Sequence, residues 1–250
     1  MAIIWQKKHL GQTYEVRTAG CSVRLYKDGV LHSQFNERQP ITGQVWDLLT
    51  LPAFFYPPQS IKRVLVLGVG GGTVIRQLNL FFQPSQIIGI DLDPTHLKVA
   101  KRFFGLNKLK NVALYCEDAN TWLQEYQGPP FDVIIEDIFT EENGEPIRAL
   151  NANKQWAHCI IHNLTDCGVA VLNFTSTSEA NASAFVRHAA INAYLKSSYL
   201  LACSRNVNIV GAFLKTKTNA KELKQKLNTH TAIDQRKKTV PLRYRMLQIK

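Results

Sequence analysis

The stretch IKRVLVLGVGGGTVIRQ, residues 61–77, decides the fold that the rest of the chain must join. Residues 64–67 are an apolar run that follows Lys62 and Arg63 and precedes glycine, which is typical of a strand buried on both faces of a parallel sheet. The glycines at 68 and 70–72 allow a sharp turn and a close approach of the backbone to a ligand, because glycine lacks a Cβ. Residues 73–80 continue at helical spacing. The stretch therefore predicts the first strand, ligand loop and helix of a βαβ unit.

The class of ligand that binds this loop is the first question. The dinucleotide pattern G-x-G-x-x-G is incomplete here because its last position is Thr73. Asp91, at the end of IIGID, stands where a carboxylate accepts both hydroxyls of a ribose. That feature suits dinucleotides and S-adenosylmethionine (SAM) equally. The alternative, a glycine loop that only packs a helix on a strand, is disfavoured by the acid that follows it.

Composition indicates an ordinary globular protein. The chain has 250 residues, 45% hydrophobic and 20% charged, enough for one large or two small domains. The five cysteines are odd in number and lack paired spacing, so they are expected to be reduced core residues. The apolar run at the N-terminus is too short for a signal peptide, and no run approaches 18 residues. We therefore expect a soluble, cytoplasmic protein without membrane contact.

The net charge of +11 is concentrated near the C-terminus, where residues 215–250 carry eleven Lys and Arg against two acids. Such a segment suits a nucleic-acid partner or a solvated amphipathic helix. Asn219 and Glu222 form a capping box ahead of Leu223 and Leu227 on one helical face, which favours the helix. Nucleic-acid binding stays open as the less favoured alternative.

The N-terminal residues predict a small β-rich module. TYEVR, CSVRLYK and VLHSQF alternate in polarity, and Ala19-Gly20 and Asp28-Gly29 separate them as turns. Dehydrogenases usually begin near the first Rossmann strand, so this module counts against them. A helix is expected over 40–55, ending near Pro52. The expected division is residues 1–58 for the β-rich module with its linking helix, and 59–250 for a Rossmann-like SAM-binding domain with a basic C-terminal segment.

Strands and helices alternate after the glycine loop, as in one parallel sheet. Strands are expected at 86–91, 112–116, 131–137 and 169–174, and helices at 95–104, 119–126, 149–163 and 179–195. The segment SSYLLACSRNVNIVGAFLK predicts two strands separated only by 204–206, which is too short for a crossover helix. This last pair must therefore be antiparallel.

Acids follow three of these strands, at Asp91 with Asp93, at Glu117-Asp118 and at Glu136-Asp137. Ligands of open α/β sheets bind outside the carboxyl ends of the strands. Acids there suit a cationic sulfonium and repel a pyrophosphate. We expect Asp91 to bind the ribose, Asp118 and the Ala119 backbone to bind the adenine, and Asp137 to face the reacting carbon. For Asp118 a helix N-cap is a nearly equal alternative.

Several segments together resemble the spermidine synthase family and its SAM-dependent methyltransferase relatives. VLVLGVGGGTVIRQL resembles the family's glycine motif, IIGIDLDPTHLKVAKRFF its ribose-binding segment, and EDANTWL with FDVIIEDIF its adenine and active-site segments. The hairpin VRLYKDGVLHSQF is similar to the family's N-terminal hairpin. The motifs keep their order and spacing over about residues 12–175.

The resemblance implies a fold and a set of site residues. The fold is α/β, a Rossmann-like methyltransferase fold with a mostly parallel sheet and an antiparallel last pair, preceded by a small N-terminal β-hairpin module. The cofactor is SAM or decarboxylated SAM, the acceptor is a small molecule, and the protein is a homodimer formed through the N-terminal module. The catalytic residue is Asp137, and the residues expected to bind the cofactor are Gly68, Gly70, Gly71, Asp91, Leu92, Asp118, Ala119 and Asp137.

Three departures from the family pattern separate the possible reactions. Gly71 stands where aminopropyltransferases have an aspartate that holds the aminopropyl chain, and Thr140 replaces the second acid of the active-site motif. Gly43 stands where the family has a tyrosine. A diamine acceptor loses charged hydrogen bonds worth about 1.5 to 3 kcal/mol each without such acids. Gly71 also removes a repulsion and is expected to leave loop N–H groups free for the donor's carboxylate.

Three hypotheses follow, in descending order of preference. The first is a methyltransferase that uses SAM on an unknown acceptor near Asp137. The second is an aminopropyltransferase that uses decarboxylated SAM and a polyamine, and the third is a non-catalytic cofactor-binding module. No metal is expected, because His158 and His162 share a helix face without a third ligand or the glutamate of an HExxH motif.

Overall fold

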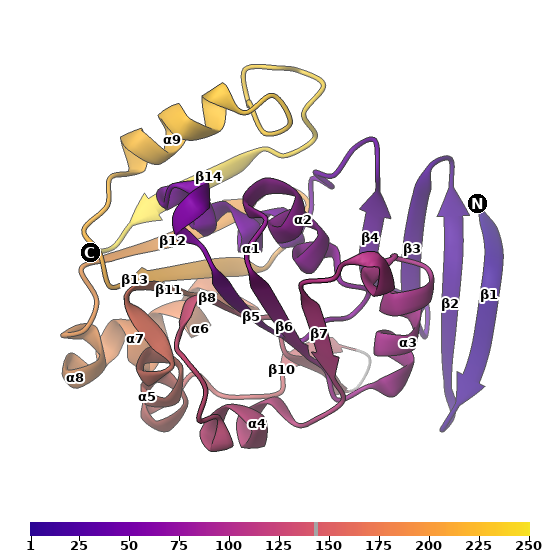
Figure 1. Ribbon diagram of the computed structural model, residues 1–250, viewed down its shortest axis with the longest axis horizontal. Coiled ribbons are helices and arrows are strands. Elements are labelled where there is room, and N and C mark those ends of the chain that lie inside the picture. The colour runs from indigo at the N-terminus through magenta and orange to yellow at the C-terminus, as the bar shows by residue number, and fades with distance from the viewer. Residues whose placement is uncertain (143–144) are drawn as a thin grey trace.

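The N-terminal part of the chain forms an antiparallel sheet of its own. The computed structural model describes residues 1–142 and 145–250. The four strands of the N-terminal sheet lie in sequence order at one end of the molecule (Figure 1). Turns at Ala19-Gly20 and at Asp28-Gly29 join the second strand to the third and the third to the fourth, as the alternating sequence predicted. The strands are β1 (Ala2–His9), β2 (Gln12–Ala19), β3 (Ser22–Lys27) and β4 (Val30–Asn36).

The main sheet is mixed and mostly parallel in its central part, which confirms the predicted fold class. β5, β6, β7, β8 and β11 run parallel, and the remaining strands are antiparallel, including the predicted last pair. The strands in sheet order are β14 (Tyr244–Gln248), β12 (Ser197–Cys203), β13 (Ile209–Leu214), β11 (Leu164–Phe174), β8 (Phe131–Glu136), β5 (Arg63–Leu67), β6 (Gln86–Ile90) and β7 (Val112–Tyr115). We call the edge where the five parallel strands end the carboxyl edge.

Helices cover both faces of this sheet, and two apolar clusters fill the space between them (Figure 1). On one face lie α1 (Val45–Thr50), α2 (Thr73–Phe82), α3 (Pro94–Arg102) and α9 (Ala220–Thr229). On the other lie α4 (Ala119–Glu125), α5 (Lys154–His162), α6 (Thr177–Ala182), α7 (Ala184–Arg187) and α8 (Ala189–Asn192). Both faces of β5 are therefore buried, as its unbroken apolar run requires.

Some expected elements differ from the structure. The helix expected over 179–195 is broken into α6, α7 and α8, because the buried Ser183 adopts an extended ψ of 153° and its hydroxyl donates to the Ala180 carbonyl at 2.7 Å. The helix expected over 40–55 is shorter, with α1 continued by a 3₁₀ turn at Leu51–Phe55. Short 3₁₀ turns also occur at Pro58–Ser60 and Leu106–Lys108.

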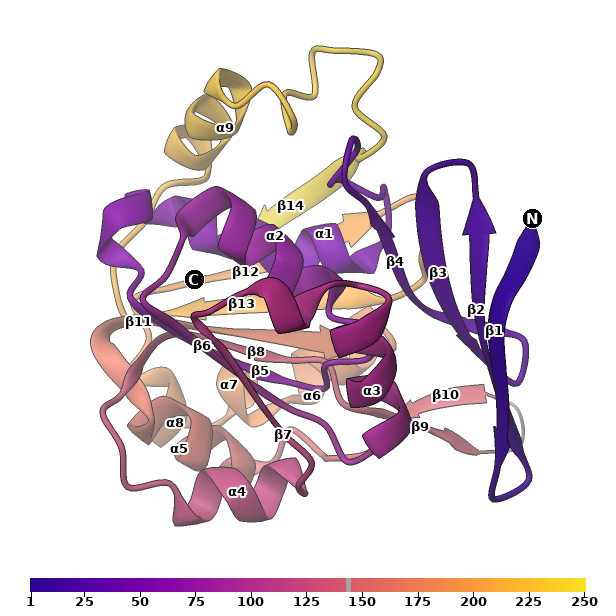
Figure 2. The same cartoon turned by 45° about the vertical axis from the view of Figure 1, so that its right-hand side comes forward.

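A hairpin that the sequence did not predict displaces the start of α5 from the expected position 149 to Lys154. It pairs β9 (Phe139–Glu142) with β10 (Glu145–Arg148), on the side of the main sheet that faces the N-terminal sheet (Figure 2). β1 and β14 were also missed, each an edge strand of its sheet. The division at residue 58 is a prediction about domains that remains untested.

Two expectations from composition can be compared with the structure. In the described ranges no helix is both long and apolar enough to span a membrane. The cysteines are free thiols, but Cys21, Cys116 and Cys167 are exposed, so the expectation that they belong to the core is wrong for these three. Cys116 follows the strand β7 and Cys167 precedes the apolar residues of β11, so a neighbouring apolar run in the sequence did not indicate burial.

Candidate active site

The glycine loop between β5 and α2 lies at the carboxyl edge and is packed against the end of β8. Gly68 has a φ of 87°, and a Cβ at this position would stand 2.1 Å from the Asp137 carbonyl oxygen. Only glycine fits here, because both the backbone conformation and the available space exclude a side chain. The Asp137 N–H donates to the Leu67 carbonyl at 2.8 Å. Loop and strand end therefore form one rigid unit, which brings Asp137 beside the loop.

The N–H groups of this loop already have partners in the protein. Those of Val69 and Gly70 donate to one oxygen of Asp91, at 2.9 and 2.8 Å, and that of Gly71 donates to the Ser33 hydroxyl at 2.7 Å. The N–H of Gly72 donates to the Val69 carbonyl at 2.7 Å. The expectation that the loop leaves N–H groups free for a donor's carboxylate is therefore wrong for this conformation. It failed because Ser33 comes from a different sheet, 38 positions away.

Asp91, the residue predicted to bind the ribose, organises the glycine loop. One of its oxygens accepts the two loop N–H groups, and the other accepts the Asp93 N–H at 2.9 Å. The His96 ring lies 3.6 Å from this second oxygen. The carboxylate has lone pairs left for a ribose, so the predicted ribose contact stays a prediction. Its neighbour Leu92 is an exposed side chain at the same edge.

Asp93, in contrast, is used by the fold. One oxygen caps α3 by accepting the Thr95 N–H at 2.8 Å, and the other accepts the Tyr14 hydroxyl at 2.6 Å. Lys27 lies 3.6 Å from the second oxygen. These contacts hold the N-terminal sheet against α3.

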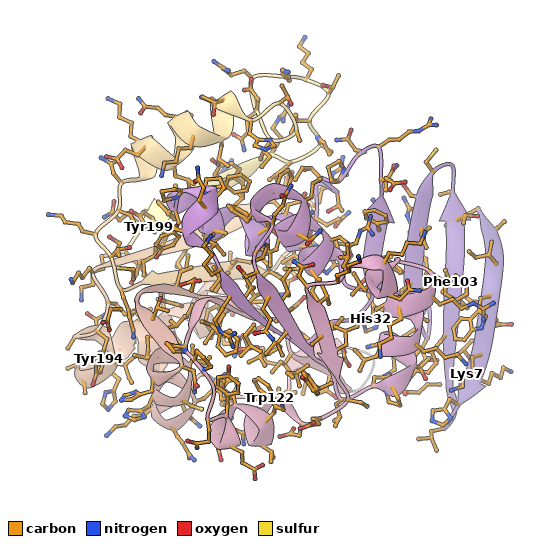
Figure 3. The ribbon with its side chains drawn as sticks, in the orientation of Figure 1. Lys7, His32, Phe103, Trp122, Tyr194 and Tyr199 are labelled. Atoms are coloured by element: carbon orange, nitrogen blue, oxygen red, sulfur yellow. The ribbon has the colours of Figure 1, made fainter. Side chains whose placement is uncertain are left out.

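His32 of β4 is a partly buried side chain at this junction that sequence reasoning missed (Figure 3). Its ring centroid lies 5.3 Å from that of His96. Burial and the nearby charges of His96 and Lys27 together lower the pKa of His32 to about 4, against the opposing charges of Asp91 and Asp93, so the ring is neutral at pH 7. Its sequence signal was confined to the segment VLHSQF, which predicted only a strand.

Asp137 follows β8 at the carboxyl edge and is partly buried, next to the fully buried Glu136. The Asn173 side-chain amide donates to one of its oxygens at 2.7 Å. Burial raises the pKa of Asp137 to about 6, the hydrogen bond from Asn173 and the charge of Arg148 oppose that rise, and the charge of Asp91 adds to it. A carboxylate with this pKa is mostly ionised at pH 7 and can still accept a proton in a reaction.

A buried cation, the guanidinium of Arg148, binds the residues next to Asp137 in the sheet. Arg148, at the end of β10, pairs with Glu136, the fully buried last residue of β8. The same guanidinium donates to the Asn173 carbonyl at 2.6 Å and lies 3.1 Å from Glu179 of α6. Glu136 is thus neutralised within the protein, which corrects the expectation that it faces a cationic donor beside Asp137. Arg148 was missed because its partners are 12 to 31 positions away in the sequence.

The adenine end of the expected site is more open. Asp118 is the N-cap of α4, and its oxygen accepts the Thr121 N–H at 2.9 Å, so the cap alternative is confirmed. The residue is exposed, and Ala119 beside it is buried. A cavity of about 250 Å³ begins at the next residue, Asn120, and extends to Leu150 and Trp156. The adenine contact itself remains a prediction.

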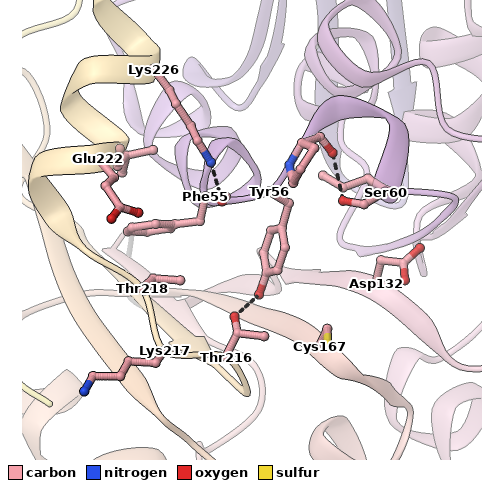
Figure 4. Close-up of a pocket in the computed structure, with 13 residues that line it drawn as sticks. Phe55, Tyr56, Ser60, Asp132, Cys167, Thr216, Lys217, Thr218, Glu222 and Lys226 are labelled. Carbon is pink, nitrogen blue, oxygen red and sulfur yellow. Dashed lines mark hydrogen bonds between the residues drawn. The ribbon is translucent and has the colours of Figure 1, made fainter.

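A larger cavity of about 360 Å³ lies at the opposite edge of the main sheet, between the Leu51–Phe55 turn and α9 (Figure 4). The Tyr56 and Thr216 hydroxyls lie 3.3 Å apart, and the Lys226 ammonium donates to the Phe55 carbonyl at 2.8 Å. Asp132 accepts the N–H groups of Lys62 and Arg63. This cavity lies at the amino edge, whereas ligands of open α/β sheets bind outside the carboxyl ends of the strands, so we do not assign the cofactor to it.

Comparison with known proteins agrees with this geometry. A methyltransferase-domain family model matches residues 58–239. The chain belongs to this methyltransferase-domain family. The domain is also 33% identical over 139 residues to polyamine aminopropyltransferase 2 of Caldanaerobacter subterraneus subsp. tengcongensis, covering 55% of this chain and 44% of that protein. The chain thus spans less than half the length of the curated aminopropyltransferases that it first matches.

Solved structures show the same fold. A probable spermidine synthase from Corynebacterium glutamicum superposes with a TM-score of 0.72 at 17% identity, covering 93% of this chain and 90% of that one. Human methyltransferase-like protein 13, solved with SAH, superposes with a TM-score of 0.61 at 19% identity, covering 73% and 88%. The resemblance of this methyltransferase domain to the spermidine synthase family is therefore confirmed. The family implies binding of SAM or decarboxylated SAM.

Proposed function

We propose that the protein is a methyltransferase that uses SAM and transfers its methyl group to a nucleophile beside Asp137. The observation that carries the choice of donor is the packing around Gly71. A Cβ there would stand 2.7 Å from the Ser33 Cβ and 2.8 Å from the Phe104 ring. The aspartate that aminopropyltransferases have at this position therefore has no room in this chain. A donor without a carboxylate loses the partner for its aminopropyl ammonium.

The residues of the carboxyl edge fit a cationic donor. Asp91 and Asp137 both contribute carboxylates, and the charge of Arg148 is already matched by Glu136 and Glu179. The resulting negative edge favours a sulfonium over a pyrophosphate. Asp91 would bind the ribose, Asp118 with the Ala119 backbone would bind the adenine, and the loop at Gly68 and Gly70 would lie against the donor. When bound, SAM supplies an electrophilic methyl group.

Asp137 provides the base that such a transfer requires. Its carboxylate stands at the strand end next to the glycine loop, and its raised pKa of about 6 keeps it able to take up a proton at pH 7. We propose that it orients the acceptor and removes the proton that the nucleophile loses. General-base action of this kind contributes about 10² to 10⁴ in rate.

Aminopropyl transfer is the second candidate, because polyamine aminopropyltransferases are among the curated relatives that the chain resembles. Calorimetric titration of the protein with SAM, with S-adenosylhomocysteine and with decarboxylated SAM tests the two candidates. We expect SAM and S-adenosylhomocysteine to bind more tightly. Tighter binding of decarboxylated SAM, together with transfer to a diamine, would reverse the choice. Binding of donors without transfer to any member of an acceptor panel would favour a non-catalytic module.

The packing of Gly71 offers a matched pair of variants for this test. Gly71→Asp in the wild-type background is expected to lose all donor binding, because its side chain collides with Ser33 and Phe104. Gly71→Asp combined with Ser33→Gly and Phe104→Ala removes both collisions and is expected to improve binding of decarboxylated SAM relative to SAM. In a folded variant of this kind, an unchanged preference would show that the residue at 71 does not select the donor.

The predicted homodimer is also part of the proposal. β1 is an edge strand of the N-terminal sheet and exposes Met1, Ile3 and Ile4. An exposed apolar edge strand is a surface on which a second strand can add. Light scattering of wild type and of Ile3→Lys/Ile4→Lys tests it: we expect a dimer that dissociates in the variant. A monomeric wild type would contradict it.

A further inference from the structure

One guanidinium joins the ends of two neighbouring strands at the carboxyl edge. The Arg148 side chain is 2% exposed, and it pairs with Glu136 of β8 while it donates to the Asn173 carbonyl of β11. Its Nε lies 3.1 Å from Glu179, which is itself held by the Thr175 N–H and hydroxyl, at 2.8 and 2.7 Å. The guanidinium carbon lies 4.7 Å from the centroid of the Phe174 ring. A planar group with this many partners fixes the relative position of the two strand ends.

The register of those strands places Asn173 beside Asp137. Leu172 of β11 is paired with Glu136 of β8, so the next residue of each strand comes at the same level. The Asn173 nitrogen donates to the Asp137 carboxylate at 2.7 Å. The amide orientation follows from this contact, because the reverse orientation would set two oxygen acceptors against each other.

Asn173 donates to Asp137 through its side-chain nitrogen, while its side-chain oxygen accepts no hydrogen bond among the described residues. Its side chain is 2% exposed. A buried amide left half unsatisfied calls for an explanation other than fold stability. The contact with the carboxylate provides one, because it holds one Asp137 oxygen and leaves the other for an incoming proton.

We infer that Arg148 and Asn173 are positioning residues for Asp137, with Arg148 acting through the Asn173 backbone and Asn173 acting directly on the carboxylate. The inference rests on the proposed role of Asp137 as base, which gives the positioning its purpose. Neither residue is needed to touch the donor or the acceptor. The charged groups that face Asp137 from neighbouring elements are Arg148 of β10 and Asp91 after β6, with Glu136 and Glu179 bound to Arg148.

The ionisation of Asp137 in the ligand-free protein provides a test that does not depend on transfer. Protein labelled with ¹³C-aspartate is titrated by NMR, and the Asp137 signal is assigned by its loss in Asp137→Asn. In wild type we expect a midpoint near 6. Asn173→Leu, which keeps the branched shape without the donor, is expected to raise the midpoint by about one pH unit. Asn173→Ala serves the same purpose if the leucine variant does not fold.

Two further variants separate positioning from general damage. Asn111→Leu removes a partly buried amide donor far from the site, which bonds to the Pro84 carbonyl at 2.7 Å, and is expected to leave the Asp137 midpoint unchanged. Arg148→Lys keeps the charge but not the planar contacts. We expect it to broaden the Asp137 signal, or to shift its midpoint by less than Asn173→Leu does. An Asp137 midpoint in Asn173→Leu equal to that of wild type would overturn the inference.

Turnover distinguishes failure of this inference from failure of the proposed function. Once an acceptor that supports transfer is known, the acid limb of the pH–rate profile should shift to higher pH in Asn173→Leu, by the same amount as the NMR midpoint. The KM for SAM should be unchanged. If the midpoint moves but wild type transfers nothing, the positioning holds and the proposed function fails. If wild type is active and neither the midpoint nor the profile moves, the positioning fails alone.

Discussion

The two halves of the carboxyl edge are built in opposite ways. Where β8 and β11 end, Glu136, Asn173 and Arg148 are buried and bonded to one another around Asp137. Where β6 and β7 end, Leu92 and Asp118 are exposed, and Asp118 only caps the helix that follows it. Burial fixes geometry and shifts pKa, whereas exposure does neither. The end of β8 and β11 is therefore organised within the protein itself, whereas the exposed residues after β6 and β7 keep groups free for a ligand.

We expect the largest effect when the buried guanidinium of Arg148 is removed. A small effect would contradict the contrast between the buried and the exposed halves. Arg148→Met leaves Glu136 and Glu179 without their partner, and breaking a buried pair in this way costs about 3 to 5 kcal/mol in the free energy of unfolding. Urea denaturation followed by circular dichroism measures it. The matched control is Arg236→Met, because the Arg236 side chain is 68% exposed and pairs with a single acid. A midpoint for Arg148→Met as close to wild type as that of the control would show that the buried half is not rigid.

Donor affinity should distinguish two acids within the half of the edge where β6 and β7 end, the bonded Asp91 and the exposed Asp118. Asp91→Ala removes a ribose acceptor and leaves the N–H groups of Val69 and Gly70 without their partner. We expect the affinity for SAM to fall by about 2 to 4 kcal/mol, the sum of two charge-assisted hydrogen bonds. Asp118→Ala changes an exposed residue and should cost less than about tenfold in the same calorimetric titration. Equal losses in the two variants would contradict the expectation that a bonded acid at this edge contributes more to donor binding than an exposed one.

The rate of transfer should depend on Asp137 more than binding does. Asp137→Asn keeps the shape of the side chain and an acceptor for the Asn173 amide, but removes the charge and the basicity. We expect SAM to bind within about tenfold of wild type, 1.4 kcal/mol, and transfer to slow at least about a hundredfold. Normal turnover would exclude Asp137 as base, and loss of SAM binding alone would make it a counter-ion.

The same residue predicts a pH dependence with a definite sign. The pKa of Asp137 is raised from 3.8 to about 6 by burial, so the folded protein favours the protonated acid. Asp137 therefore adds to the free energy of unfolding below pH 4, and this contribution is lost as the pH rises through 6. Activity runs the other way, because the base must be ionised, so kcat/KM should fall below pH 6. A rate profile that is flat between pH 5 and 7 would contradict this assignment.

Sequence patterns predicted the central architecture well, because they rest on local rules. The apolar run before Gly68, the turn at Asp28-Gly29 and the acids at strand ends all depend on neighbouring residues. What could not be predicted depends on contacts between distant residues. Ser33 reaches Gly71 across 38 positions, and Arg148 reaches Asn173 across 25. Neither residue has a local pattern that distinguishes it from an ordinary serine or arginine.

Of the helices predicted from periodicity in the C-terminal half, one is confirmed and one is interrupted in the structure. α9 was predicted from its cap at Asn219 and its apolar face, and Leu223 and Leu227 are buried as expected. The helix expected over 179–195 is interrupted at Ser183, because that residue bonds to the preceding turn instead of continuing it. Helical periodicity alone does not reveal such competition from a side chain.

The smallest effect is expected from the basic C-terminal segment, which extends the comparison to a surface away from the carboxyl edge. Its arginines are partly engaged within the segment: Arg236 donates to Asp234 and to the Asn228 carbonyl, and Arg243 donates to the Val240 carbonyl. We therefore expect Arg236→Ser/Lys237→Ser/Lys238→Ser to leave donor binding and transfer unchanged. Nucleic-acid binding that depends on phosphate contacts falls steeply with salt, so fluorescence anisotropy with a labelled oligonucleotide between 50 and about 200 mM salt tests the alternative. Weak binding that is equal in wild type and variant fits a solvated helix. Tight, salt-sensitive binding that is lost in the variant would instead make this segment the docking surface for a nucleic-acid acceptor.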